Sequence, residues 1–266
     1  MSRQYLREEI ERKLTSTIED YLTNWEPKTT NFLDKLFPEE RRVHSIMTGL
    51  LTSMGTKVWE HLARFCAEHN GYKIMNVKEL KRPNSLPPQI TDVIVKWEHE
   101  RLSGKGDLLL EGYIRELRET VKRYELQRNG SIPYQRGEGV DLCFYKEGKF
   151  LLVDMKTVQP NQGGGNKFNK TIMNWYAYFI IQNPDVEVNC FIGFPYNPYV
   201  PESWWSRNGG RVFPLVEGID AKIENDVWDL FSGYDDTWSI IQEALDNLSM
   251  QNLSGKFKHI FYPETK

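Results

Sequence analysis

Two apolar runs separated by a pair of turn-forming residues place the strongest constraint on how this chain can fold. The runs span residues 140–145 and 150–158 and consist mainly of aliphatic, β-branched and aromatic residues, a composition that favours buried β-strands. Between them, Glu147-Gly148 suits the two-residue turn of a β-hairpin. We therefore expect a hairpin at the centre of a sheet that is covered on both faces.

The register of this hairpin brings two carboxylates together. A turn at residues 147 and 148 pairs position 146 with 149 and, by continuation, Asp141 with Asp154. Like charges opposite each other destabilise a sheet, and two carboxylates among apolar neighbours are costly to bury unless a cation lies between them. Lys156 lies two residues beyond Asp154, so strand alternation points both side chains to the same face.

This arrangement is typical of a metal-dependent hydrolytic site. Oxygen ligands favour Mg²⁺, with Mn²⁺ as a substitute, over zinc. A lysine beside such carboxylates can orient a metal-bound water, lower its pKa, or stabilise charge on a phosphorane-like transition state. The alternative is a buried strand in which Lys156 pairs with an acid only to stabilise the sheet.

The rest of the chain alternates predicted helices and strands. Leu6, Ile10, Leu14, Ile18 and Leu22 form the apolar stripe of a first helix that closes at Pro27. A long helix follows from Pro38 to Asn70, in which Gly49 and Gly55 indicate a bend or a close backbone approach. The remaining expectations are strands at 72–77, 90–97 and 186–194, helices at 114–124, 168–182, 227–231 and 238–248, and an irregular segment at 195–214.

Composition limits the classes of protein to which the chain can belong. Cys66, Cys143 and Cys190 form no C-x-x-C pair, which argues against a zinc site or a disulfide framework and favours a reducing cytoplasm. We expect no secretory signal, because residues 1–23 lack an apolar h-region, and no membrane span, because no apolar run reaches the ~18 residues that one needs. The net charge of −3, from 34 basic and 37 acidic residues, means that a nucleic-acid surface must be local.

Two segments carry candidate nucleic-acid contacts. The glycine-rich residues 162–166 lead into a helix with Lys167 and Lys170, where backbone amides and lysines suit a phosphate. A flexible loop with solvated lysines is the alternative. Residues 195–211 hold Asn197, Arg207 and Arg211, residue types that contact adenine and guanine in the major groove; ordinary aromatic packing around a loop is the competing interpretation.

These residues carry a family resemblance. Gly139-Val140-Asp141 followed by Val153-Asp154-Met155-Lys156 resembles the PD-(D/E)XK nuclease motif, with Val140 where a proline is usual. A narrower resemblance, which covers most of the chain, is to type II restriction endonucleases that cut GGNCC-like palindromes. It rests on residues 51–56 with Trp59-Glu60, on residues 156–161, and on residues 195–199.

The resemblance implies an α/β fold with a PD-(D/E)XK core, a mixed central sheet flanked by helices. It further implies Mg²⁺-dependent, sequence-specific hydrolysis of double-stranded DNA that leaves 5′-phosphates, and a methyltransferase that protects the host without direct contact. Asp141 and Asp154 would bind metal and Lys156 would assist the attacking water. Glu60 matches the helix glutamate that completes many such sites, although it could instead pair only with Lys57 or Arg64 on a solvated face; Glu138 is a weaker rival. Gln159 and Asn161 are expected to contact DNA.

We expect a single domain over residues 1–266, with the nuclease core at about 39–195, an N-terminal helical extension at 1–37 and a C-terminal recognition or accessory segment at 196–266. A palindromic site favours a homodimer. The first helix could contribute its apolar stripe to that dimer, or pack the stripe on its own subunit. Two other functions remain open: another PD-(D/E)XK enzyme, such as a junction resolvase or exonuclease, and a non-catalytic DNA-binding module.

Overall fold

A five-stranded mixed sheet forms the centre of the computed structural model, which describes residues 2–26, 32–104, 110–126, 131–134, 138–156 and 158–263. Its strand order is β1-β4-β5-β6-β7. The first three strands in this order are antiparallel neighbours, and β5, β6 and β7 run parallel. The strands are β1 (Lys73–Met75), β4 (Leu142–Lys146), β5 (Lys149–Met155), β6 (Glu187–Phe194) and β7 (Ala221–Ile223). A separate pair joins β2 (Lys81–Arg82) to β3 (Ile132–Pro133).

The predicted hairpin is confirmed as β4 and β5. Its pairs run from Lys146 opposite Lys149 to Leu142 opposite Val153, which is the register expected from the sequence. The turn residues have φ angles of 50° at Glu147 and 84° at Gly148, and glycine adopts such angles at little cost.

Each face of the sheet is covered by its own hydrophobic core, as strand alternation requires. Cys143 and Leu152 belong to the core beneath α5 (Pro88–Ser103), α6 (Glu111–Arg123), α7 (Gly164–Gln182) and α8 (Trp204–Val212). Leu142 and Val153 belong to the opposite core, with residues of α1 (Arg3–Thr23), α4 (Glu60–His69), α9 (Asn225–Ser232) and α10 (Thr237–Met250). This confirms the mixed sheet flanked by helices.

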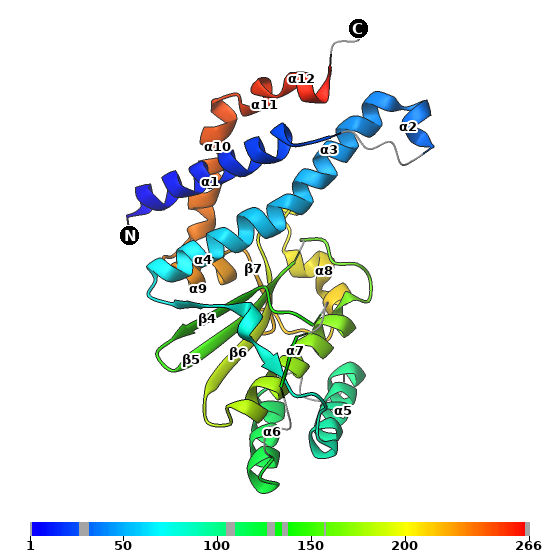
Figure 1. Ribbon diagram of the computed structural model, residues 1–266, viewed down its shortest axis with the longest axis vertical. Helices are drawn as coiled ribbons and strands as arrows, with labels where there is room; N and C mark the ends of the chain where they lie inside the picture. The colour runs from blue at the N-terminus through cyan, green and yellow to red at the C-terminus, as the bar shows by residue number, and fades with distance from the viewer. Residues whose placement is uncertain are drawn as a thin grey trace.

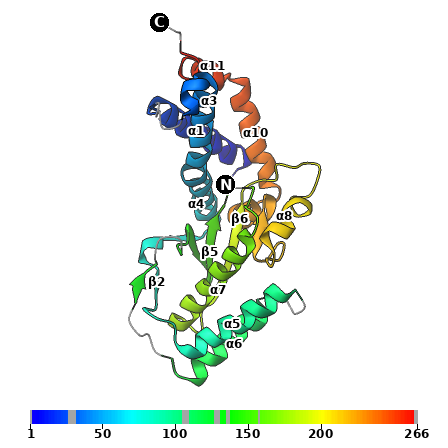
Figure 2. The ribbon, with the colours of Figure 1, turned by 90° about the vertical axis from the view of Figure 1, so that its right-hand side faces the viewer.

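The helices extend the molecule along one axis. Figures 1 and 2 show α1, α3 (Pro38–Met54) and α10 at one end of the molecule, with α5 and α6 at the other. The short helices α2 (Leu33–Leu36), α11 (Leu253–Lys256) and α12 (Lys258–Phe261) lie beside α3 at the first end, and the single turn η2 (Val77–Glu79) follows β1. Among the residues that the structure describes, no helix is long and apolar enough to cross a membrane.

The strand predicted at 90–97 is wrong, because these residues lie in α5. Pro88 occupies the first turn of that helix, where proline is tolerated, and Gly104 ends it in the left-handed conformation. Ile90, Val93 and Ile94 are buried, and their spacing places them on one helical face.

The segment 195–214 is also more regular than predicted. It contains α8, whose Ser203 side chain caps the helix by accepting a hydrogen bond from the Trp205 amide. In addition, α7 begins at Gly164, four residues before the predicted start at Phe168.

The long helix predicted from Pro38 to Asn70 is interrupted by a π-helical turn, η1 (Gly55–Trp59). The close approach expected at Gly49 is confirmed, since a Cβ there would lie 2.0 Å from the Tyr21 hydroxyl. A π turn holds more residues than an α turn, so the apolar residues before and after it do not share one face of the helix. Met47 is exposed, whereas Val58 and Leu62 are buried. Pro27, the predicted end of the first helix, lies outside the described residues.

Candidate active site

Asp141, Asp154 and Lys156 lie together where the hairpin meets β6. Asp141 directly precedes β4, and its amide donates to the Val153 carbonyl at 3.0 Å. Asp154 pairs with Ile192 of β6, and the Lys156 amide donates to the Gly193 carbonyl at 2.9 Å. The backbone therefore holds all three residues on the rigid centre of the sheet.

The two aspartates lie side by side, with Asp154 buried and Asp141 partly buried. Asp154 is 6% exposed, and the Met155 amide donates to Asp141 Oδ2 at 3.1 Å. Burial, a hydrogen bond with Asp141 and the charge of Asp141 raise the pKa of Asp154 to about 8. Lys156 Nζ donates to Asp154 Oδ1 and opposes this shift. A cation beside this pair would favour the ionised form of Asp154.

Glu60 is brought toward this pair by α4, which begins at Glu60 immediately after the π turn. Its pKa is raised by burial and by the negative charge of Asp141, while Arg64 and Lys156 lower it. The Glu60 side chain is only 16% exposed. The alternative interpretation was that Glu60 pairs only with Lys57 or Arg64 on a solvated helix face. Glu60 does pair with Arg64 at 3.2 Å, but this pair lies at the edge of the acidic site.

Arg64 is a residue that the sequence argument did not assign to the site. Its Nη2 donates to Glu60 Oε2 at 3.2 Å and to the Asp141 carbonyl at 2.8 Å. The spacing of four residues on one helix could have signalled the first contact. The second contact spans 77 residues, and no local pattern indicates it.

The donor set fits a hard divalent cation in composition. Asp141 and Asp154 offer carboxylate oxygens, which Mg²⁺ prefers. Within the described part of the chain, however, no three histidine, cysteine, aspartate or glutamate side chains are grouped so that they could hold a metal ion. Glu60 therefore stands apart from the two aspartates in this arrangement, and waters or DNA oxygens would complete the coordination.

Glu138, the rival for Glu60, is engaged elsewhere. Its carboxylate pairs with Arg82 at 2.8 Å, and its carbonyl accepts a hydrogen bond from Trp175 Nε1 at 2.8 Å. These contacts tie Glu138 to β2 and α7. Its side chain is directed to a partner outside the aspartate pair.

Four of the predicted DNA contacts surround the start of α7. Gln159, Asn161, Lys167 and Lys170 are all exposed. Both lysines line a hollow of about 190 Å³ that Thr171 and Trp175 also border. The structure thus gathers cationic side chains on α7, the helix that follows Lys156 in the chain.

The predicted base-reading residues lie beyond β6. Asn197 is bonded within its own turn, since its Nδ2 donates to the Glu202 carbonyl at 2.8 Å and its Oδ1 accepts from the Tyr199 amide at 3.0 Å. Arg207 pairs with Glu202 at the surface, and Arg211 is exposed one turn further along α8. Trp204 Nε1 donates to the Val158 carbonyl at 2.8 Å, which anchors α8 beside the segment that follows Lys156.

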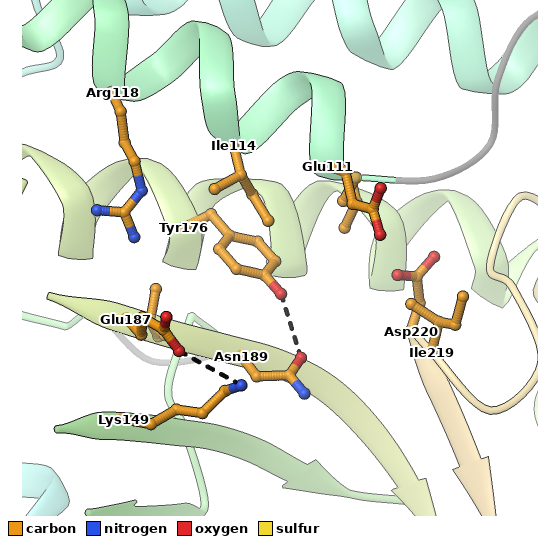
Figure 3. A pocket seen from close by; sticks show the side chains of 11 residues that line it. Glu111, Ile114, Arg118, Lys149, Tyr176, Glu187, Asn189, Ile219 and Asp220 are labelled. Atoms are coloured by element: carbon orange, nitrogen blue, oxygen red, sulfur yellow. Dashed lines mark hydrogen bonds and ion pairs between the residues drawn. The ribbon is translucent and has the colours of Figure 1, made fainter. Parts of the chain in front are cut away.

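A pocket of about 340 Å³ lies at the other end of the same strands (Figure 3). Lys149 begins β5 and Glu187 begins β6, whereas Asp154 lies near the end of β5. Lys149 pairs with Glu187 at 3.5 Å, and the Tyr176 hydroxyl donates to Asn189 Oδ1 at 3.3 Å. The pocket therefore lies at the opposite end of β5 from Asp154, and two of its polar pairs are bonded to each other.

Comparison with known proteins bears directly on this geometry. The chain is 26% identical over 220 residues to the type II restriction enzyme MjaII of Methanocaldococcus jannaschii. The aligned region covers 80% of this chain and 56% of that protein, so the chain spans just over half the length of this relative. A family model described as the type II restriction endonuclease HinfI matches residues 2–249. Because that match includes nearly the whole chain, the chain belongs to the HinfI family of type II restriction endonucleases.

Proposed function

We propose that this protein is a type II site-specific deoxyribonuclease that hydrolyses phosphodiester bonds in double-stranded DNA. The observation that carries the proposal is the placement of Asp141, Asp154 and Lys156 at one point of the central sheet. Family membership supports it, since the matching family consists of restriction endonucleases. The products would carry 5′-phosphates, and the site would be a GGNCC-like palindrome, as the resemblance of residues 51–60, 156–161 and 195–199 implies.

Asp141 and Asp154 would hold Mg²⁺, or Mn²⁺ in its place, with Glu60 as a further ligand. The bound ion would supply Lewis-acid activation of water and charge stabilisation at the phosphate. Lys156 Nζ, which already reaches Asp154, would orient the attacking water and stabilise the negative charge that develops in the transition state. The rigid backbone pairing around Asp154 would hold these groups in position between turnovers.

The surfaces beside this site would bind the DNA. Gln159, Asn161, Lys167 and Lys170 would contact the phosphate backbone near the start of α7, where exposed cations suit a polyanion. Asn197, Arg207 and Arg211 would read bases. For Arg207 this requires release from Glu202, an exposed pair of the kind that contributes little to stability.

We also propose the domain plan expected from the sequence: a nuclease core at about 39–195, an N-terminal helical extension and a C-terminal recognition segment within one domain. The C-terminal segment contributes to the core as well, since it supplies β7 and the fully buried Trp228 and Phe231. The enzyme would act in the cytoplasm, with host DNA protected by a methyltransferase that makes no direct contact.

The enzyme would act as a homodimer, because a palindrome presents two equivalent strands. Leu6, Ile10 and Leu14 of α1 are fully buried within one subunit, so the apolar stripe of α1 packs on its own chain and other surfaces would form the dimer. Sedimentation with a cognate duplex should report two subunits per DNA. One subunit per duplex at saturation, together with nicking of single strands, would instead indicate a monomer.

The decisive experiment is plasmid cleavage by Asp141→Asn and Asp154→Asn variants. Each should abolish Mg²⁺-dependent cutting while the fold persists, since the amide keeps the shape of the side chain but loses the charge that binds a cation. Asp185→Asn is a matched control, because Asp185 is 78% exposed and pairs only with Lys122 among the contacts described. Full cleavage by either site variant would remove the site assignment.

The same assay separates the other functions. Discrete bands from circular plasmid, followed by run-off sequencing of their ends, would identify the recognition site and the cut position. Cleavage confined to free ends or branched junctions would indicate an exonuclease or a resolvase. A gel shift without cutting in Mg²⁺ would indicate a binding module.

A further inference from the structure

A single guanidinium nitrogen joins two parts of the active site that are distant in sequence. Arg64 Nη2 donates to Glu60 Oε2 at 3.2 Å and to the main-chain carbonyl of Asp141 at 2.8 Å. Glu60 and Arg64 lie on α4, whereas Asp141 leads into β4. Arg64 therefore bonds the helix that carries one proposed ligand to the strand entrance that carries another.

The choice of acceptor atoms suggests what this bond does. Arg64 contacts the carbonyl of Asp141 and leaves its carboxylate, which accepts the Met155 amide at 3.1 Å, directed toward Asp154. It contacts one of the two Glu60 oxygens, Oε2. Arg64 thus orients the residues that carry the proposed metal-binding carboxylates, and it does not bond to all of their carboxylate oxygens.

The position of Glu60 in the chain explains why a hydrogen bond from Arg64 would fix its orientation. The residue directly follows a π-helical turn, and five residues of that turn separate it from α3. Arg64 supplies the side-chain hydrogen bond that holds Glu60 Oε2 at the start of α4.

We propose that Arg64 is a positioning residue that sets the geometry of the metal site by holding Glu60 and the Asp141 backbone together. This inference rests on the proposed function, since it assumes that these carboxylates bind Mg²⁺. Electrostatics alone makes the opposite prediction. Removing a positive charge next to a cation site should tighten metal binding, whereas removing a positioning contact should weaken it, by roughly 10-fold or more for an outer partner of a ligand.

The test is the affinity of the DNA-free protein for Mn²⁺ and Mg²⁺, measured by calorimetry on the whole chain. Arg64→Gln should weaken binding by about 10-fold. Lys57→Gln is the matched control, because Lys57 is an exposed cation in the π turn that leads into α4, and it should leave affinity unchanged. Unchanged or tighter binding by Arg64→Gln would overturn the proposal.

A double substitution shows whether Arg64 acts through Glu60. In a Glu60→Gln background, Arg64→Gln should weaken metal binding by much less than it does in the wild type, because part of its effect is already lost. Equal effects in both backgrounds would assign Arg64 a purely structural role and contradict the proposal. Thermal unfolding of each variant provides a control for folding.

Arg64→Lys keeps the test decisive if the glutamine variant does not fold. Both contacts come from one nitrogen, which a lysine ammonium can partly replace. Binding should therefore recover to within a few-fold of the wild type, and a loss of about 10-fold or more in a folded Arg64→Lys protein would contradict the proposal. If the wild type itself neither binds metal nor cuts DNA, the proposed function is refuted. If the wild type does both and the Arg64 substitutions leave its metal affinity unchanged, only this inference is refuted.

Discussion

Replacing Gly165 with a larger residue should force the helices α7 and α8 apart. Gly165 lies in the first turn of α7, where a Cβ would be 2.0 Å from the Phe213 carbonyl oxygen and 2.4 Å from the carbonyl carbon and oxygen of Val212. These are backbone atoms at the end of α8, so no side-chain rotation relieves the overlap. Because non-bonded carbon contacts are best near ~3.5 Å, the two segments would have to part by more than an ångström.

Gly165→Ala should therefore destabilise the fold at the upper end of the overpacking range, by about 3 kcal/mol. For a protein of this size that corresponds to a fall in Tm of roughly 6–12 °C. Because Trp204 ties α8 to Val158 near Lys156, the shift should also reduce cleavage of cognate DNA.

Gly210→Ala is the matched control for this prediction. Gly210 lies within α8 and is exposed, and a Cβ added there would meet nothing within 4 Å. The substitution should stabilise by up to about 1 kcal/mol, the usual gain from replacing a helical glycine. Both variants are measured by thermal unfolding in one buffer. A Gly165→Ala protein that melts at or above the wild-type temperature would refute the packing described for α7 and α8.

Two further predictions address the site and the core. Lys156→Ala should lower the cleavage rate far more than affinity for the same oligonucleotide, because we propose that Lys156 acts in the transition state; an equal loss in both would make it a phosphate anchor. Arg101→Met should cost about 3–5 kcal/mol in chemical denaturation, since it leaves the carboxylate of Asp220 buried without its partner. In the Arg101→Met background, Asp220→Asn should recover part of the lost stability. If the two substitutions instead destabilise additively, Arg101 and Asp220 do not act as one unit.

The sequence by itself determined the elements whose causes are local. The Glu147-Gly148 turn and the alternation of the flanking strands set the register of β4 and β5. The pairing ends at Leu142 opposite Val153, so Asp141 directly precedes it, and the Asp141 carboxylate accepts the amide of Met155 beside Asp154. Such inferences succeed because a two-residue turn leaves a hairpin one in-register pairing. The helices α1, α6, α9 and α10 were also predictable, since each carries an apolar stripe with helical period.

Tertiary structure decided the features that depend on contacts between distant segments. Ile90, Val93 and Ile94 suit either a buried strand or a helical face, and packing against α6 and α7 selects the helix. Similarly, the sequence offered Glu60 and, as a weaker rival, Glu138, and only the fold paired Glu138 with Arg82 and Glu60 with Arg64. The bond from Arg64 to the Asp141 carbonyl has no counterpart in any local pattern. A hydrogen bond across 77 residues exists only once the helix and the hairpin have packed together, because side-chain spacing along one element carries no information about the surface that another element will present.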